Sequence, residues 1–525
     1  MACSVDSNHT TMTPLLCPSD RAVDARHLAI DIKFCANGND RLSSRHWYWR
    51  KLESTVDPFR NSTPDIEGIY EVLKIIICLP ISVIRLLLFV VCLSVGYVAT
   101  LLAIYKWNDN NNPMPRWRSR FMGVTRLCAR AILFAFGYHW IRRKGKPAPR
   151  EVAPIVVSNH VSYIEPIFFF YDLCPTIVAS VTHDSLTVVG TIIRAMQVIY
   201  VDRFSPLSRS QAVHEIKRKA SCNDFPRLLL FPEGTTTNGK ALLSFKLGAF
   251  IPGYPIQPVV VRYPFVHFDQ SWGNVSLLKL FFRMFMQFHN FMEVEYLPVI
   301  NPSDYEREDP SSFCARVSDA IATSLNVVQT SYSFGDMMLL MKAQEAKHVN
   351  PSSFMVEMAR VEALFDISIS EALSLLESFL SMDPDTSGCI SFSGFSRALA
   401  FRDCSVTEEI FKLLDGHQTG MITFKQFVYA FGHLLKRSFI WEALDAFFVQ
   451  DNKHNPEICQ QEFEDMVRLA VPDIEYSEIH RLFEMFEHNS NRQISRDDFV
   501  SGLRKNPLLL VYFVPLSSWQ SLSNS

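Results

Sequence analysis

The stretch that decides the fold runs from residue 155 to residue 165 and reads Ile-Val-Val-Ser-Asn-His-Val-Ser-Tyr-Ile-Glu. Its first three residues are β-branched and apolar, which predicts the end of a buried strand. The Ser-Asn pair that follows favours a turn, and Pro166 suits the first turn of a helix. The sequence therefore predicts a tight connection from strand to helix, with His160 near its start and Glu165 near its end.

His160 and Glu165 are the candidate catalytic residues. A carboxylate that binds one ring nitrogen of a histidine fixes the tautomer and leaves the other nitrogen as a general base near neutral pH. Taken alone, the same two residues are more typical of a buried structural histidine beside a solvated helix start. The residues downstream decide between these two interpretations.

Composition excludes several classes of protein. The 525 residues allow two to four domains, and the formal net charge of −3 gives no strongly basic field, so no nucleic-acid partner is expected. The 12 cysteines form no CxxC pairs. That pattern argues against a disulfide framework or a structural zinc site and favours a reducing compartment.

Residues 1–55 are polar and lack periodicity, which predicts a disordered N-terminal segment. Residues 68–105 are predicted to insert into a membrane, because Leu86 to Tyr105 is a run without charge that suits one crossing of a hydrocarbon core of about 30 Å. Pro80 and Arg85 also allow a hairpin that dips into one leaflet and returns. Spanning and dipping both remain open at this point.

Residues 120–330 are predicted to form an α/β domain, with a sheet covered by helices. Strand-like runs occur at residues 154–157, 176–181, 198–201, 228–231 and 258–262, with helical patterns between them. Alternating strands and helices place the chemistry of such a domain at the strand ends.

Three further stretches of this domain carry candidate binding residues. Arg203 ends a strand, where a guanidinium can grip a phosphate bidentately. Glu233, Gly234 and Thr235 form a loop after an apolar strand, and a glycine there lets backbone N–H groups approach a ligand. Prolines flank the strand that begins near residue 255. Taken singly, these are also the features of a surface ion pair, an ordinary turn and a core strand.

Taken together and in this order, the blocks resemble the glycerolipid acyltransferase family, which uses acyl-CoA. That family has a His-x4-Asp pair, a strand that ends in Arg, a Phe-Pro-Glu-Gly-Thr block and a proline-rich strand. Here they appear as His160 with Glu165, Arg203, residues 231–235 and residues 255–258. The resemblance covers residues 65–330. When the helical C-terminal part is included, the resemblance extends to lysophospholipid acyltransferases with EF-hand-like tails. The sequence looks most similar to the plant lysophosphatidylethanolamine acyltransferases.

The chain departs from the family pattern at two positions. Glu165 stands where most of the family has Asp; it is one methylene longer and still able to accept the imidazole N–H. Thr236 stands where many relatives have Arg, and Lys240 or Lys246 are candidates to supply that charge.

The resemblance implies acyl transfer without a serine or cysteine nucleophile. His160 would take the proton from a lysophospholipid hydroxyl, which attacks the thioester of acyl-CoA, while Glu165 orients the ring. Acyl-CoA is the implied co-substrate, no cofactor is required, and the implied partners are membrane lipids and acyl-CoA. The residues that would hold the acceptor's phosphate are Arg203, Glu233, Gly234 and Thr235.

Residues 345–505 are predicted to form an all-α EF-hand-like domain with four degenerate loops. The apolar residue at position 8 of each loop is isoleucine, at 390, 422, 458 and 494. Weak calcium candidates lie in the first loop, whose position 12 is Gly394 instead of a bidentate Glu; they are Asp383, Asp385, Ser387 and Cys389. We expect a structural role for this domain. Residues 506–525 form a short tail whose apolar run at 507–514 is too short to span a membrane.

The resulting hypothesis is an acyltransferase of lysophosphatidylethanolamine, lysophosphatidylcholine and other head groups, in phospholipid synthesis and remodelling. It would reside in the endoplasmic reticulum or a related internal membrane, with its catalytic and EF-hand parts in the cytosol. Two alternatives remain. One changes the acceptor to lysophosphatidic acid or glycerol 3-phosphate, and the other is a non-catalytic, calcium-responsive membrane adaptor.

Overall fold

The structure is a computed structural model that describes residues 57–107, 112–264, 268–273, 275–303, 308–398, 408, 411–412, 414–415, 418–436, 457–470, 474, 476–486 and 492–505. The predicted disordered segment 1–55 and the tail at 506–525 lie outside these residues. So do residues 451–456 and 487–491, which belong to the third and fourth predicted EF-hand loops.

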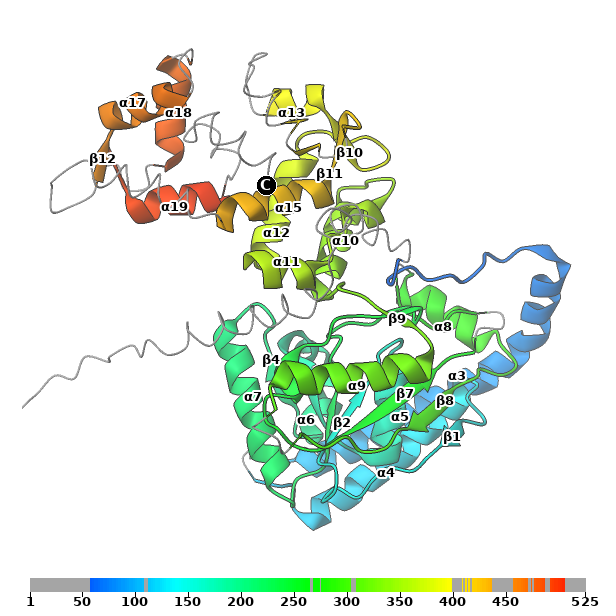
Figure 1. Ribbon diagram of the computed structural model, residues 1–525. Coiled ribbons are helices and arrows are strands. Elements are labelled where there is room, and N and C mark those ends of the chain that lie inside the picture. Colours follow the sequence, from blue (N-terminus) through cyan, green and yellow to red (C-terminus); the bar gives the residue numbers. More distant parts are fainter. Residues whose placement is uncertain are drawn as a thin grey trace, which may run out of the picture. The chain divides into compact units, whose positions relative to one another are not determined.

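A seven-stranded sheet in the order β1-β8-β7-β2-β5-β3-β4 carries the acyltransferase blocks (Figure 1). Five strands from β7 to β4 run parallel, and β8 is antiparallel to β7 and parallel to β1. The strands are β1 Arg142–Lys144, β2 Ile155–Ser158, β3 Thr176–Ser180, β4 Ile199–Val201, β5 Leu228–Leu230, β7 Ile256–Arg262 and β8 Glu293–Tyr296. The five parallel strands correspond to the five predicted ones, and the sequence analysis missed β1 and β8.

Alternate residues of β2 point to opposite faces of the sheet, as the strand geometry requires. Ile155 and Val157 pack on one face against α7 (Pro206–Ser221) and α9 (Pro310–Leu325). Val156 packs on the other face, which is covered by α4 (Arg116–Ala135), α5 (Ile164–Leu173) and α8 (Leu277–Phe285). Because β2 is covered on both sides, it reads in sequence as a continuous apolar run.

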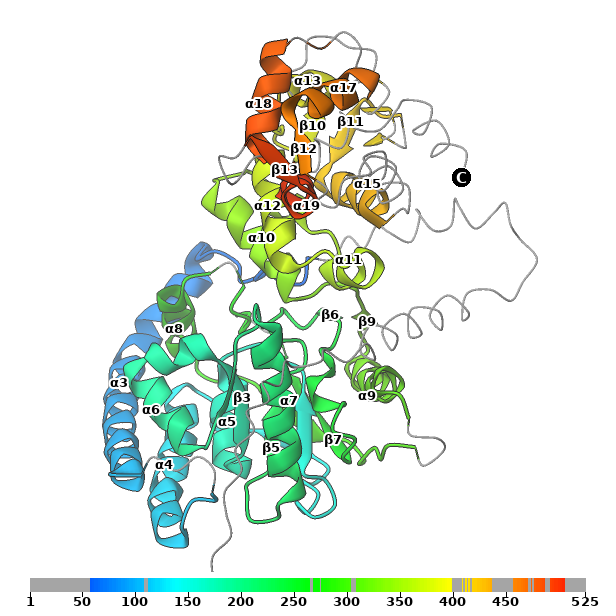
Figure 2. The ribbon, with the colours of Figure 1, turned by 90° about the vertical axis from the view of Figure 1, so that its left-hand side faces the viewer.

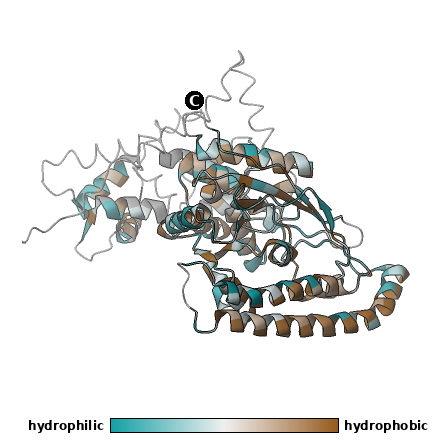
Figure 3. Ribbon diagram, turned by 90° about the horizontal axis from the view of Figure 1, so that it is seen from below, coloured by the Kyte–Doolittle hydropathy of each residue, from teal (hydrophilic) through white to brown (hydrophobic). Residues whose placement is uncertain are grey.

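The predicted membrane segment is a single helix, α3 (Gly68–Ile104), which continues through Pro80 instead of turning back as a hairpin. Within the described residues it is the one helix long and apolar enough to cross a membrane. It runs beside α4 and α6 (Thr187–Ala195), as Figure 2 shows. Hydrophobic residues cover most of its length (Figure 3), and many of them are exposed.

One stripe of α3 is buried against the sheet domain. Its members recur at helical spacing and include polar and small residues: Lys74, Cys78, Ser82, Arg85, Gly96, Ala99, Thr100 and Ala103. Arg85 donates from Nη1 to the carbonyl of Gln287 (2.6 Å) and from Nη2 to that of Phe288 (2.7 Å). Ser82 Oγ donates to the carbonyl of Phe285 (2.8 Å). These bonds attach α3 lengthwise to the domain.

The C-terminal part contains helices joined to short paired strands. Its helices are α10 Phe334–Glu345, α11 Met358–Phe365, α12 Ile369–Leu380, α13 Phe392–Ala398, α15 Phe424–Lys436, α17 Gln460–Ala470, α18 Tyr476–Phe486 and α19 Arg496–Lys505. The two antiparallel strand pairs are β10 (Cys389–Ser391) with β11 (Met421–Thr423), and β12 (Glu457–Cys459) with β13 (Gln493–Ser495).

The position-8 isoleucines lie opposite each other in these pairs, Ile390 against Ile422 and Ile458 against Ile494. The EF-hand assignment stays a prediction. A further parallel pair joins β6 (Ala241–Leu242) to β9 (Val328–Gln329). Single-turn 3-10 helices complete the elements, at Val181–Ser185, Leu247–Ala249 and Pro351–Phe354.

Candidate active site

The carboxyl ends of three neighbouring parallel strands converge on one edge of the sheet. His160 follows β2, residues 231–235 follow β5, and Tyr263 follows β7. In open α/β sheets, ligands bind outside this edge. The topology therefore brings together blocks that lie about 70 to 100 residues apart in the sequence.

The predicted pair of His160 and Glu165 is brought together. Nδ1 of His160 lies 2.9 Å from Oε2 of Glu165. The Glu165 side chain is fully buried in the first turn of α5, and the backbone N–H of Ser162 donates to both of its oxygens, Oε1 at 3.0 Å and Oε2 at 2.8 Å. The His160 side chain is 18% exposed. The bond at Nδ1 leaves Nε2 as the nitrogen available to a substrate.

The ring and backbone of His160 are held from the strand next to it. The imidazole stacks on Phe231, with ring centroids 4.1 Å apart and planes inclined by 20°. Its backbone N–H donates to Oε1 of Glu233 (2.9 Å), and its carbonyl accepts from Thr237 N (2.9 Å). The conformation of His160 therefore depends on the loop after β5.

Glu233 has a different environment from the one expected of a phosphate-binding residue. It is fully buried, and its Oε2 accepts from the backbone N–H of Leu243 (3.1 Å). Burial raises the pKa of Glu233 to about 8, against the opposing effect of its two backbone donors. Because both oxygens bind backbone N–H groups inside the protein, this buried residue supports the backbone around His160.

Asn159 is a structural residue of the site that the sequence analysis missed. Its Nδ2 donates to the carbonyl of Val261 and its Oδ1 accepts from the N–H of the same residue, both at 2.9 Å. This two-bond clamp ties the residue before His160 to the end of β7. Nothing in a single sequence indicates such a pairing, because it depends on which strand lies beside β2.

Gly234 and Thr235 lie next to Glu233 in the same loop. Gly234 adopts φ +73°, a region that favours glycine, although a Cβ there would meet no atom within 4 Å. Thr235 is 7% exposed, and its hydroxyl contacts Sδ of Met337. Backbone conformation is thus what Gly234 supplies, and the Thr235 hydroxyl is already engaged.

Arg203 lies just beyond β4 and is half-buried. Its guanidinium carbon is 4.4 Å from the ring centroid of Phe334, and burial lowers its pKa from the ordinary value. In the described part of the chain it forms no ion pair with a carboxylate. Of the two candidate lysines, Lys240 donates to Ser62 Oγ (2.7 Å) and Lys246 pairs with Glu362 (3.0 Å), so each is already engaged.

The calcium candidates lie in a loop that satisfies its own oxygens. Oδ1 of Asp385 accepts from the backbone N–H groups of Ser387 and Cys389, each at 2.9 Å. A Cβ on Gly394, at position 12, would lie 2.8 Å from the carbonyl oxygen of Met382, so a longer side chain does not fit there without a shift. Asp383 has φ +58°. The weak calcium site remains a prediction.

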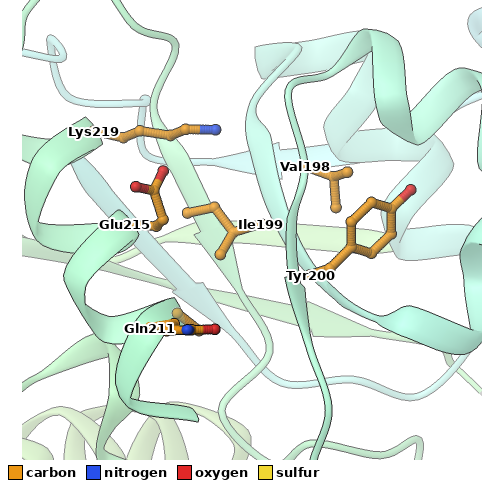
Figure 4. Close-up of a pocket in the computed structure, with 7 residues that line it drawn as sticks. Val198, Ile199, Tyr200, Gln211, Glu215 and Lys219 are labelled. Carbon is orange, nitrogen blue, oxygen red and sulfur yellow. The ribbon is translucent and has the colours of Figure 1, made fainter. Parts of the chain in front are cut away.

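A shallow pocket lies away from these residues. Figure 4 shows its lining, which comes from β4 and α7 and includes Tyr200, Glu215 and Lys219. The Lys219 amine donates to the carbonyl of Gln197 (2.6 Å), and burial lowers its pKa to about 8. His160 and Glu165 do not line this pocket, and an amine that is already bonded to a backbone carbonyl supplies no separate chemistry.

Comparison with known proteins agrees with the geometry. Residues 141–262 match the family model described as Acyltransferase. The chain is 60% identical over 463 residues to lysophospholipid acyltransferase LPEAT2 of Arabidopsis thaliana, covering 88% of this chain and 86% of the relative. It is 30% identical to lysophosphatidylcholine acyltransferase 1 of Danio rerio, covering 76% of this chain and 77% of the relative.

Among solved structures, the 1-acyl-sn-glycerophosphate acyltransferase PlsC of Thermotoga maritima aligns with 46% of this chain and 96% of its own, at 16% identity and a TM-score of 0.32. That likeness is too low to support an argument, and the family assignment depends on the sequence relatives. These relatives match most of the chain, including the residues that match the family model. The chain therefore belongs to the lysophospholipid acyltransferase family.

Proposed function

We propose that this protein transfers an acyl group from acyl-CoA to the free hydroxyl of a lysophospholipid, with lysophosphatidylethanolamine as the first acceptor to test and lysophosphatidylcholine next. The observation that carries the proposal is the 2.9 Å contact between His160 and a fully buried carboxylate at the carboxyl end of β2. The relatives are named as a lysophospholipid acyltransferase and a lysophosphatidylcholine acyltransferase, which supports a lysophospholipid acceptor.

His160 acts as the general base in this reaction. Its Nε2 takes the proton from the acceptor hydroxyl while that oxygen attacks the thioester carbonyl, and an ester bond forms as the C–S bond breaks. The thiolate of CoA then recovers the proton from the imidazolium. Glu165 keeps Nδ1 protonated and stabilises the imidazolium that forms in between, as the carboxylate of a catalytic triad does.

Arg203 is the candidate for binding the acceptor's phosphate. A half-buried guanidinium without an acidic partner in the described residues retains its donors for an anionic ligand. The aromatic face of Phe334 holds the guanidinium from one side. Gly234 contributes backbone freedom, and Glu233 and Thr235 support the loop instead of contacting the phosphate.

We propose that α3 lies in one leaflet and does not cross the membrane. Before the helix, Asn61 donates to the carbonyls of Asp269 (3.0 Å) and Ser271 (2.6 Å). After it, Arg118 of α4 donates to the carbonyl of Ala103 (2.7 Å). A helix of 37 residues is about 55 Å long, well beyond a hydrocarbon core of about 30 Å. A helix whose two ends are fastened to one folded domain keeps both ends on one side.

In this arrangement the exposed apolar face of α3 would lie in lipid and the active site beside the bilayer, where both substrates carry their acyl chains. The membrane would be the endoplasmic reticulum or a related internal membrane, with the domain on the cytosolic side. The C-terminal helices would form an EF-hand-like domain of structural role. The facing pairs of position-8 isoleucines support that assignment.

An acceptor panel tests the proposed function. The full chain, reconstituted in vesicles, is given labelled acyl-CoA with lysophosphatidylethanolamine, lysophosphatidylcholine, lysophosphatidic acid or glycerol 3-phosphate. Faster transfer to the first two supports the proposal. Preference for either of the last two establishes the alternative acceptor class, and absence of transfer to all four, with retained membrane binding, favours the non-catalytic adaptor.

Cysteine labelling tests the position of α3. Asp65→Cys and Arg116→Cys place thiols before and after the helix, and a membrane-impermeant maleimide is added to sealed vesicles of one orientation. Peptide mass spectrometry separates these thiols from the native cysteines. Labelling of both from the same side supports the docked helix, and labelling from opposite sides shows that α3 spans.

A further inference from the structure

Three buried hydroxyl groups near the candidate dyad have no hydrogen-bond partner among the described residues. They belong to Tyr138, Ser162 and Tyr263. The rings of Tyr138 and Tyr263 pack edge to face, with centroids 6.3 Å apart. Native proteins rarely bury hydroxyls unpaired, and such groups often mark a functional contact.

Tyr263 lies where it can reach the dyad. It directly follows β7, the strand beside β2, and it comes two residues after Val261. The Asn159 clamp binds both backbone groups of Val261. The clamp therefore joins the residue before His160, just after β2, to the end of β7, from which Tyr263 follows.

The Glu165 carboxylate has one oxygen with spare accepting capacity. Oε2 accepts from His160 Nδ1 and Ser162 N, whereas the one hydrogen bond that Oε1 accepts from a described residue comes from Ser162 N. The side chain is fully buried, and a buried carboxylate is costly to ionise unless several donors surround it. An additional donor at Oε1 would reduce that cost.

The electrostatic field of Glu165 reaches both phenols. The pKa of Tyr263 is raised well above its usual value, first by burial and next by the charge of Glu165. The pKa of Tyr138 is raised in the same direction by burial, by Tyr163 and by Glu165. A phenol held neutral in this way remains a donor at every pH at which the enzyme works.

We propose that Tyr263 is a positioning residue whose hydroxyl donates to Oε1 of Glu165, holding the carboxylate ionised and directed at Nδ1 of His160. The extra methylene of Glu165, relative to Asp, carries the carboxylate toward this hydroxyl. Tyr138 packs behind the ring of Tyr263. This inference rests on the proposed function, because it assigns a role within the same catalytic dyad.

The first test is Tyr263→Phe in the full chain, which removes one hydroxyl and keeps the ring. We expect kcat to fall roughly ten- to hundred-fold, as for loss of a hydrogen bond to a charged group, with KM for acyl-CoA and acceptor nearly unchanged. The acid limb of the kcat/KM profile moves to higher pH, because a carboxylate that loses a donor makes the dyad bind its proton more tightly.

Tyr296→Phe is the matched control. Tyr296 is also buried, and its hydroxyl binds Oδ2 of Asp172 (2.5 Å), away from the dyad. Its loss should lower stability without moving the pH profile. If Tyr263→Phe behaves like this control, the inference is overturned.

Two further measurements separate this inference from the proposed function. In a Glu165→Asp background the shorter carboxylate no longer reaches the hydroxyl. Adding Tyr263→Phe should then lower kcat by less than about three-fold, and additive losses would overturn the inference.

The second measurement does not require turnover: it is the pH at which diethylpyrocarbonate modifies half of His160, followed by peptide mass spectrometry. This pH should rise in Tyr263→Phe and stay the same in Tyr296→Phe. If it is unchanged in Tyr263→Phe, the inference is overturned even if no acceptor is found. A wild type that is inactive on every acceptor overturns the proposed function alone.

Discussion

Replacing Glu165 by glutamine tests the role of the carboxylate with little change of shape. Ser162 N can still donate to the amide oxygen. The amide NH₂ then faces His160 Nδ1, which must accept a hydrogen bond instead of donating one. The imidazole proton moves to Nε2, so the nitrogen that should take the substrate proton already carries one.

The expected loss follows from the charge that is removed. The two groups are in contact at 2.9 Å, so the centres of the delocalised charges of a carboxylate and an imidazolium lie about 4 Å apart, and their attraction is about 4 kcal/mol at an effective dielectric constant of about 20. Losing that stabilisation in the transition state lowers kcat by roughly a thousand-fold. The altered tautomer acts in the same direction.

The assay is transfer of labelled acyl groups to lysophosphatidylethanolamine by reconstituted wild type, Glu165→Gln and Glu165→Asp at saturating substrates. Thermal unfolding of each protein shows whether the fold is retained. Glu165→Asp is the control, because it keeps the charge and should retain much more activity than the amide. A folded Glu165→Gln enzyme with kcat within about three-fold of the wild type would refute the reasoning.

Three further predictions concern residues around the dyad. Asn159→Ala leaves the N–H and carbonyl of Val261 without their side-chain partner, which should cost about 2–4 kcal/mol of stability and lower the melting temperature by roughly 4–10 °C. The control, Asn223→Ala at the exposed surface, should change the melting temperature by about 1 °C or less. Equal shifts for the two variants would contradict the clamp. The pKa of Glu233 is about 8 in the folded state against an ordinary value of 4.5, so between these pH values the native state keeps a proton that the unfolded state releases. The free energy of unfolding should therefore decline between pH 4.5 and 8, by up to about 1.4 kcal/mol per pH unit. Denaturation of wild type and Glu233→Gln over that range should give a flatter slope for the variant, and parallel slopes would disprove the raised pKa. Arg203→Ala should raise KM for a phosphate-bearing acceptor roughly ten-fold or more while leaving KM for acyl-CoA nearly unchanged, and an unchanged acceptor KM would remove this residue from the binding site.

The parallel strands and the dyad could be predicted because their signals are local. A β-branched run such as residues 155–157 predicts a buried strand wherever that strand lies in the sheet. His160 and Glu165 are five residues apart across one turn, so their contact needs only the predicted connection from strand to helix. The long apolar segment 68–105 predicted a membrane helix by composition alone.

The supporting residues could not be predicted because their roles depend on which strands become neighbours. Glu233 was expected to face a phosphate, yet the pairing of β2 with β5 turns it under the backbone of His160. Asn159 and Tyr263 are significant only because β7 lies on the other side of β2. The edge strand β1 and its neighbour β8 were not predicted because they are short and rich in charged residues, Arg-Arg-Lys in β1 and Glu-Val-Glu-Tyr in β8.

The most direct test is kcat of His160→Ala for acyl transfer to lysophosphatidylethanolamine, compared with that of the wild type. Thermal unfolding must first show that the variant is as stable as the wild type. We expect turnover to fall by at least about a thousand-fold, because the variant lacks the nitrogen proposed to take the hydroxyl proton. A folded variant that retains a tenth or more of the wild-type kcat would show that His160 is not the base.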